Sequence, residues 1–110
     1  MDDYNMTMVQ GDTLCLSVEV EGLDGDITGA EFLAKMDLDG DVAICKDYGN
    51  GIEYAGREDD TWYYNVQLDP EDTENLPTGQ YYYQLKIALD SNIFTVLKGI
   101  LKIERNIGYV

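Results

Sequence analysis

Apolar and polar residues alternate along most of this chain. The pattern is clearest over residues 13–21, where the apolar members are Leu14, Leu16, Val18 and Val20. Successive side chains of a β-strand point to opposite faces, so a period of two predicts a strand with one buried face.

The same period recurs often enough to predict an all-β chain of about eight strands. The predicted strands cover residues 4–9, 13–21, 32–38, 42–46, 52–55, 62–68, 81–89, 94–97 and 100–103. Turn sequences such as Asp-Gly and Gly-Asn-Gly separate them about every ten residues, which is typical of an antiparallel sandwich or barrel. One helical turn is expected over residues 69–73, because an acidic residue there precedes a proline.

The length of the chain sets the number of domains. A chain of 110 residues has the usual size of one domain, so residues 1–110 are predicted to form a single unit. No strand is followed by a helical pattern of ten or more residues, which excludes Rossmann and P-loop folds.

The negative net charge of the chain limits the classes of partner that it can bind. The chain has 22 acidic and 7 basic residues and a net charge of -15, and phosphate contacts need clustered Lys and Arg, so nucleic-acid binding is not expected. No apolar run approaches the roughly 18 residues of a membrane span, and the first four residues lack the start of a signal peptide. Most acidic residues fall in turns, where they would favour solubility.

The sequence offers few residues for catalysis. The chain contains no histidine, so neither Ser-His nor Cys-His machinery can form within it. A pair of carboxylates could hydrolyse a glycoside, but among 22 acidic residues some pair will always lie at a suitable separation, so such pairs do not indicate an enzyme. We therefore expect no enzyme activity, no catalytic residue and no cofactor.

Metal sites are also not expected. Residues 37–41 read D-L-D-G-D, but the glycine and the residue at the twelfth position do not fit an EF-hand, so a hairpin is favoured. A weak cation site that also uses Asp24 and Asp26 stays open. Cys15 and Cys45 form no C-x-x-C pair and are expected to be reduced, partly buried thiols unless their strands are neighbours.

Aromatic residues are the candidate interface. Strand parity places Trp62 and Tyr64 on one face and Tyr63 on the other, and it opposes Tyr82 to Tyr81 and Tyr83. The candidate interface aromatics are Tyr63, Tyr82 and Trp62, for a partner protein or a stacked sugar.

Tyr81 has a structural interpretation. It follows L-P-T-G-Q at the start of a long strand, which is the position of the tyrosine corner in immunoglobulin-like β-sandwiches. Such a tyrosine ties the preceding turn through its hydroxyl. The predicted fold is therefore an antiparallel immunoglobulin-like sandwich, although Tyr83 stands where an antibody domain has its second cysteine.

Several short motifs resemble a known family over residues 10–103. They are Q-G-D-T at 10–13, D-G-D-I-T-G-A at 24–30, G-I at 51–52, L-D-P-E-D-T at 68–73, L-P-T-G-Q-Y-Y-Y at 76–83 and L-K-G-I-L-K-I at 97–103. This layout resembles the immunoglobulin-like N-terminal domain of phage baseplate upper proteins and small prophage structural proteins. The resemblance implies a tail, baseplate or fibre-associated assembly module in a virion or in the cytoplasm of a lysogenic host. It implies other phage structural proteins, or a second copy, as partners, and no nucleic acid or membrane.

Two other functions stay open. Aromatic residues near acidic turns are compatible with a carbohydrate-binding or adhesion module. The charge of -15 is compatible with an acidic DNA mimic, which would need its carboxylates gathered on one face.

Overall fold

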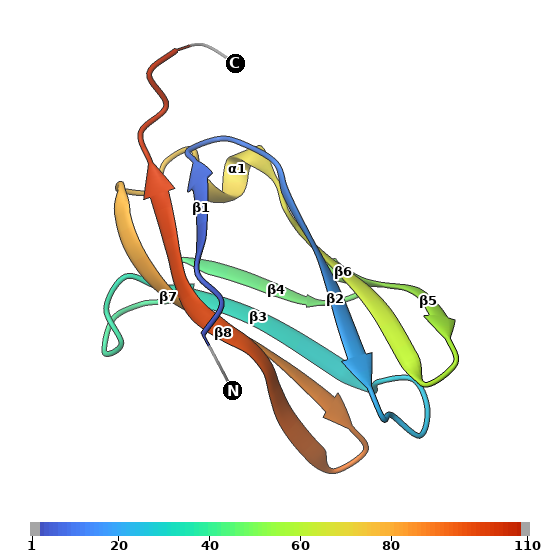
Figure 1. The fold of residues 1–110 in the computed structure, drawn as a ribbon. Coiled ribbons are helices and arrows are strands. Elements are labelled where there is room, and N and C mark those ends of the chain that lie inside the picture. The colour runs from blue at the N-terminus through green and yellow to red at the C-terminus, as the bar shows by residue number, and fades with distance from the viewer. Residues whose placement is uncertain (1–2, 109–110) are drawn as a thin grey trace.

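The computed structural model describes residues 3–108, which form eight strands and one helical turn (Figure 1). The elements are β1 (Met6–Val9), β2 (Leu14–Glu21), β3 (Gly29–Lys35), β4 (Ile44–Tyr48), β5 (Gly51–Glu58), β6 (Thr61–Leu68), α1 (Pro70–Thr73), β7 (Gly79–Leu89) and β8 (Asn92–Glu104). The prediction of an all-β chain is confirmed. The single domain was predicted over residues 1–110, of which 1, 2, 109 and 110 lie outside the described residues.

The strands form one mixed sheet in the order β1-β8-β7-β3-β4-β5-β6-β2. The expectation of a purely antiparallel arrangement is wrong at two places, because β1 pairs with β8 in parallel and β4 pairs with β5 in parallel. At the second place Gly49 and Gly51 have φ of 86° and 98°, values that glycine adopts readily. The chain therefore turns sharply there and continues into β5 without reversing.

The sheet curls until its two halves face each other across the core (Figure 1). One half contains β1, β8, β7, β3 and β4, and the other contains β5, β6 and β2. The β4–β5 pairing joins the halves into one sheet, so they are not the two separate sheets that a sandwich in the strict sense would have. Inward residues of both halves fill the core, and the largest fully buried side chains include Tyr81, Phe32, Ile52 and Leu68.

Strand boundaries differ from the sequence prediction at several places. The strand predicted at 32–38 begins at Gly29 and ends at Lys35, so residues 36–38 belong to the loop before β4. The strand predicted at 42–46 is shifted to Ile44–Tyr48. The segments 94–97 and 100–103 are parts of one strand, because β7 and β8 form a long hairpin whose register shifts between Leu85 and Lys86.

The predicted helical turn is confirmed as α1, and it is held to the sheet by Lys46. Pro70 is at the start of the turn, and the backbone N–H of Asp69 donates to the carboxylate of Asp72 at 2.6 Å. Lys46 points inward from β4, and its Nζ lies 2.8 Å from Oδ2 of Asp72. The hydrogen bond to Asp72 is the largest cause that raises the pKa of Lys46. The ion pair thus joins β4 to the segment that precedes β7.

The start of β7 is fixed by Tyr81. Its side chain is fully buried, and its hydroxyl donates to the carbonyl oxygen of Pro77 at 2.6 Å. This is the contact that defines a tyrosine corner. Two residues on, Tyr83 stacks on Phe32 of β3 with ring centroids 5.6 Å apart. In residues 3–108, no helix has the length and apolar character needed to cross a membrane.

Candidate interaction face

The outward side chains of β3, β7 and β8 form a surface that we call the lysine face. Residues paired across neighbouring strands point to the same side of a sheet. One row of such partners is Lys35, Tyr82 and Ile100, the next is Leu33, Gln84 and Lys98, and further rows contain Lys86 and Lys102. Four of the five lysines of the chain therefore point outward from this side.

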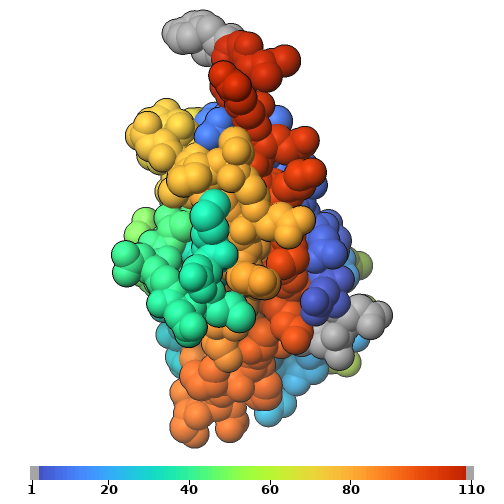
Figure 2. Space-filling view, turned by 90° about the vertical axis from the view of Figure 1, so that its left-hand side faces the viewer, coloured from blue at the N-terminus to red at the C-terminus, as the bar shows by residue number. Residues whose placement is uncertain are grey.

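Figure 2 views the molecule from this side, with β7 between β8 and the loop that follows β3. The loop extends the apolar surface, because Leu38 is 65% exposed and Met36 is 42% exposed. Tyr82 adds an aromatic ring that is 46% exposed. Large apolar side chains and lysines thus share one surface.

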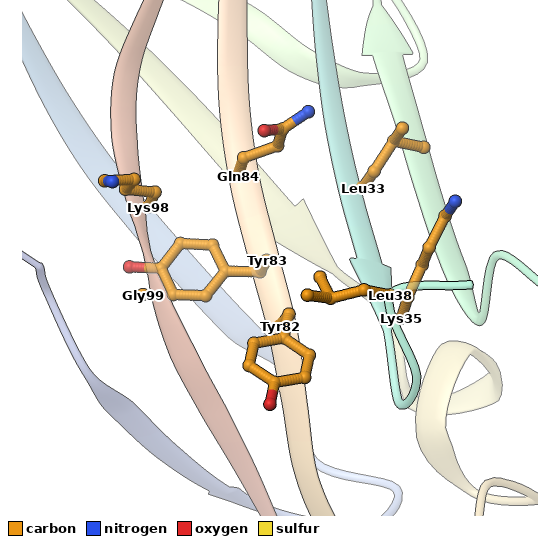
Figure 3. A pocket seen from close by; sticks show the side chains of 8 residues that line it. All are labelled: Leu33, Lys35, Leu38, Tyr82, Tyr83, Gln84, Lys98 and Gly99. Carbon is orange, nitrogen blue, oxygen red and sulfur yellow. The ribbon is translucent and has the colours of Figure 1, made fainter. Parts of the chain in front are cut away.

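A shallow groove of about 320 Å³ runs across the lysine face. Figure 3 shows Lys98 and Lys35 on opposite sides of this groove, with Tyr82 and Leu38 between them. Leu33 and Gln84 also line it. The groove therefore has an apolar floor and a cationic group at each side, a combination that suits an apolar anchor flanked by carboxylates.

Gly99 lets the N-terminal segment pass close to β8. A Cβ built on Gly99 would overlap the carbonyl group of Tyr4, so the N-terminal segment passes close to the strand at this point. The backbone N–H of Tyr4 donates to the Lys98 carbonyl at 2.8 Å, and the Tyr83 hydroxyl donates to the Tyr4 carbonyl. Burial is the largest cause that raises the pKa of Tyr83 to about 12.

The lysines of this face differ in how far they are neutralised. Lys86 stands opposite Glu31 in the sheet and donates to the Thr95 hydroxyl at 2.9 Å. Lys98 has one weak ion pair, with Asp3 at 3.9 Å, and both side chains are more than half exposed. Within residues 3–108, no ion pair involves Lys35 or Lys102. Positive charge is therefore available around the groove.

The opposite outer surface has the reverse charge, and we call it the acidic face. It consists of the outward side chains of β2, β5 and β6 and carries four exposed carboxylates: Glu19, Glu21, Glu53 and Glu58. Tyr63 lies among them. Desolvation, followed by the charges of Glu58 and Glu19, raises the pKa of Tyr63.

The three candidate interface aromatics do not come together. Tyr82 lies on the lysine face and Tyr63 on the acidic face, so the two rings cannot form one stacking platform. The assignment of Trp62 to an interface is wrong, because its side chain points inward with Tyr64 and is only 8% exposed. The Arg57 guanidinium lies 4.9 Å from the centre of the Trp62 ring system, and the indole N–H is buried without a hydrogen-bond partner.

The acidic turns serve local structure. The carboxylate of Asp26 accepts hydrogen bonds from the hydroxyls of Tyr64 at 2.9 Å and Tyr48 at 3.1 Å. Burial and this hydrogen bond raise the pKa of both phenols. In the loop after β3, the N–H of Gly40 donates to the carbonyl of Asp37 at 2.9 Å, as a tight turn requires.

The cysteines lie apart and outside the core. The expectation of partly buried thiols is wrong, because Cys15 and Cys45 both have outward parity and are exposed. Their strands β2 and β4 are not neighbours in the sheet. The Sγ of Cys45 lies within 4.8 Å of carboxylate oxygens of Glu31 and Asp47, and desolvation followed by these two charges raises its pKa.

Sequence reasoning missed the lysine face. The signal was available on β7, where Tyr82, Gln84 and Lys86 share the polar parity of the strand. The outward residues of β3 and β8 belong to the same surface only because β7 pairs with both strands. The alternation within each strand does not reveal which strands pair.

Comparisons with known proteins add little. No protein-family model matches the chain, and no curated protein sequence matches it significantly. Among solved structures, the chain is similar to the IG1–IG1 heterodimer of ZIG-8 and RIG-5, with 16% identity and a TM-score of 0.38. That likeness covers 93% of this chain and 82% of the other. A TM-score this low supports no conclusion about fold or function.

Proposed function

We propose that this protein is a non-catalytic interaction module of a phage or prophage particle, built on an immunoglobulin-like fold, that binds another protein through its lysine face. The carrying observation is that four of five lysines point outward on the face that holds an exposed apolar groove, and two of them line this groove, in a chain of net charge -15. Such segregation of charge favours one orientation of docking.

The strand order supports the immunoglobulin-like part of the proposal. Variable-type immunoglobulin domains pair strands B, E and D on one side and C′, C, F and G on the other. The corresponding strands in chain order are β2, β6 and β5, and β4, β3, β7 and β8, and they are neighbours here in the same order. The hydrogen bond from Tyr81 to Pro77 is the accompanying corner contact.

The chemistry of the groove supports the protein-binding part. Interfaces are enriched in tyrosine and apolar anchors at the centre, with charged groups at the rim. Tyr82, Leu33 and Leu38 provide the central apolar area, and Lys35 and Lys98 stand at the sides. The matching partner surface has an apolar side chain flanked by Asp or Glu.

The placement in a phage particle rests on the motif resemblance over residues 10–103. Several of those motifs occupy the turns that fix the fold, such as L-P-T-G-Q-Y-Y-Y before and within β7. A small domain of this kind suits an assembly subunit, which acts by binding other proteins through its surface.

The test is to follow the chain into particles. After prophage induction in the host, the protein should co-sediment with tail proteins in a density gradient and be found by mass spectrometry. Tyr82→Ala combined with Lys98→Glu should reduce its amount in particles at least about tenfold, since an interface centre commonly contributes 2 kcal/mol or more. Tyr63→Ala combined with Glu53→Gln is the matched control on the acidic face and should leave incorporation unchanged.

Two results would reject the proposal. If the wild-type chain is absent from particles that contain tail proteins, the phage role fails. If both double variants are incorporated as well as the wild type, the lysine face is not the binding surface.

The two alternative functions have less support. A carbohydrate platform would need aromatic rings side by side, whereas Tyr63 and Tyr82 lie on opposite faces. A DNA mimic would need its carboxylates on one surface. Here carboxylates occupy the acidic face and also the turns at both ends of the molecule, including Asp24 and Asp60 at one end and Asp39 and Glu71 at the other.

A further inference from the structure

The curled sheet does not close, and the opening lies between β2 and β8. β2 is an edge strand, paired only with β6. On the other side of the opening, β1 pairs with β8 only at residues 101–104. Figure 1 shows β1 and the N-terminal segment covering one end of this opening, which we call the seam.

The seam contains a groove of about 440 Å³. Its walls are β2, from Cys15 to Glu19, and Val96 and Leu97 of β8, with Tyr4 at one end. Leu16, Val96 and Leu97 are only partly buried and pack against the core. The groove is thus a place where the hydrophobic core reaches the surface along the edge of a sheet.

The edge of β2 has the backbone chemistry that a further strand needs. In an antiparallel pair, every second residue turns its N–H and C=O away from its neighbour. Among the described residues, no backbone hydrogen bond reaches the free side of β2 over Leu14–Glu21. Natural proteins usually protect such an edge with lysine, proline, a bulge or a covering segment. Residues 14–21 contain no lysine or proline, and β2 pairs with β6 without a bulge.

The side chains of β2 define which strand would fit. Its inward residues Leu16 and Val18 are apolar, and its outward residues Glu19 and Glu21 are acidic. Cross-strand neighbours prefer opposite charge on one face and apolar contact on the other. A complementary strand therefore alternates apolar residues with Lys or Arg.

We propose that the seam accepts an extended segment of a partner protein, which adds to β2 as a further strand and alternates apolar with basic residues. This is strand addition, in which main-chain hydrogen bonds supply affinity and alternate side chains supply specificity. The site is separate from the lysine face, since β2 belongs to the other half of the sheet.

A second copy of the chain fits the seam poorly. An antiparallel pairing of β2 with β2 would bring the Glu19 and Glu21 side chains of two copies onto one continuous face. The C-terminal residues 105–108 leave β8 at the end where α1 lies, away from the groove (Figure 1). A basic segment of another protein is therefore the occupant that the charges favour.

Cys15 offers a direct test, because its thiol lies on the outer face of β2 and lines the groove. The probe is the blocked peptide KVKVCVKVK, with its cysteine carried as a mixed disulfide with thionitrobenzoate. Attack by the Cys15 thiolate joins protein and peptide by a disulfide and releases coloured thionitrobenzoate. The control peptide KKVVCVVKK has the same composition without the alternation.

The protein carrying Cys45→Ser has Cys15 as its remaining thiol, and the protein carrying Cys15→Ser has Cys45. We expect the alternating peptide to react with Cys15 about tenfold faster than the shuffled one, as strand pairing holds the sulfurs together. At Cys45 the two peptides should react equally. Glu19→Lys with Glu21→Lys should remove the advantage and transfer it to EVEVCVEVE.

Amide hydrogen exchange provides the second readout. The disulfide-linked complex should show slower exchange in β2 than the protein linked to the shuffled peptide. Equal reaction of both peptides at Cys15, an equal advantage at Cys45, or unchanged exchange in β2 would each overturn the proposal. Tyr82→Ala should leave the reaction unchanged, so failure here and failure of the lysine-face proposal are separate results.

Discussion

The lysine face and the acidic face lie on opposite sides of one core and differ in almost everything except strand geometry. Facing inward, both present apolar residues in strict alternation. Facing outward, one presents Lys35, Lys98 and Lys102 around Tyr82, and the other presents four glutamates around Tyr63. The net charge of -15 therefore does not describe the lysine face. Alternation determines which residues face the core, whereas the pairing of strands determines which charges become neighbours.

The two faces cover one core, so we expect both halves of the sheet to unfold as one cooperative unit. Tyr83→Ala should cause the largest loss of stability in both halves. Tyr83 is 3% exposed and stacks on Phe32, and its hydroxyl anchors the Tyr4 carbonyl. Removing a buried aromatic side chain typically costs about 3–5 kcal/mol, which is a large share of the stability of a small domain.

Two probes report on the two halves of the sheet in urea unfolding. Fluorescence of Trp62 follows β6, and pulsed amide hydrogen exchange follows the buried strand β7. We expect both transitions to move to lower urea together. Tyr82→Ala, at the adjacent outward position, is the control and should change the free energy of unfolding by only about 0.5 kcal/mol. Separate transitions would show that the halves unfold independently.

High pH should destabilise both halves through their buried phenols. Tyr64 lies beneath the acidic face and Tyr83 beneath the lysine face, and burial is the largest cause that raises the pKa of each. A raised pKa means that the folded state holds the proton more tightly. The stabilisation is complete below about pH 10, the unfolded value, and is lost as pH rises towards about 12 for Tyr83.

The expected slope is about 1.4 kcal/mol per pH unit for each such group. Lys46 adds to the same trend, since its pKa is raised mainly by the Asp72 hydrogen bond. Urea unfolding between pH 8 and pH 11 measures the slope. Tyr64→Phe and Tyr83→Phe should each make it shallower. A free energy of unfolding that stays constant to pH 11 would contradict the prediction.

Much of the fold was predictable because alternation is a local property. Leu14 to Val20 and Tyr81 to Leu89 show their buried faces directly in the sequence. The parallel pairing of β1 with β8 was not predictable, because it joins residues about ninety-five positions apart through hydrogen bonds that leave no pattern in either segment.

The candidate site was predicted only in part, for the same reason. The outward parity of Tyr82 follows from its own strand, but the neighbours that give it a role, Lys35 and Lys98, come from β3 and β8. Trp62 shows the converse error, since a large aromatic ring was assigned to an interface although its parity matches the buried Tyr64. The hydrogen bonds from Tyr48 and Tyr64 to Asp26 were not predictable either, because they form only when the turn before β3 folds back over β4 and β6.

The smallest expected effect gives the sharpest test of the comparison, because it places the same new charge on each face. Asn65→Lys puts an ammonium directly opposite Glu53 on the acidic face, and Gln84→Lys puts one directly opposite Lys98 on the lysine face. Opposite charges facing each other across strands contribute about 0.2–1 kcal/mol, and like charges cost a similar amount. Both variants lower the net negative charge equally, so the difference between them isolates the local field.

We expect Asn65→Lys to be more stable than Gln84→Lys by about 0.5–1 kcal/mol in urea unfolding at low salt. The difference should shrink in about 1 M sodium chloride, because the screening length falls there to about 3 Å. Equal stabilities at low salt would mean that the two faces do not differ in potential, and the charge argument for the lysine face would fall.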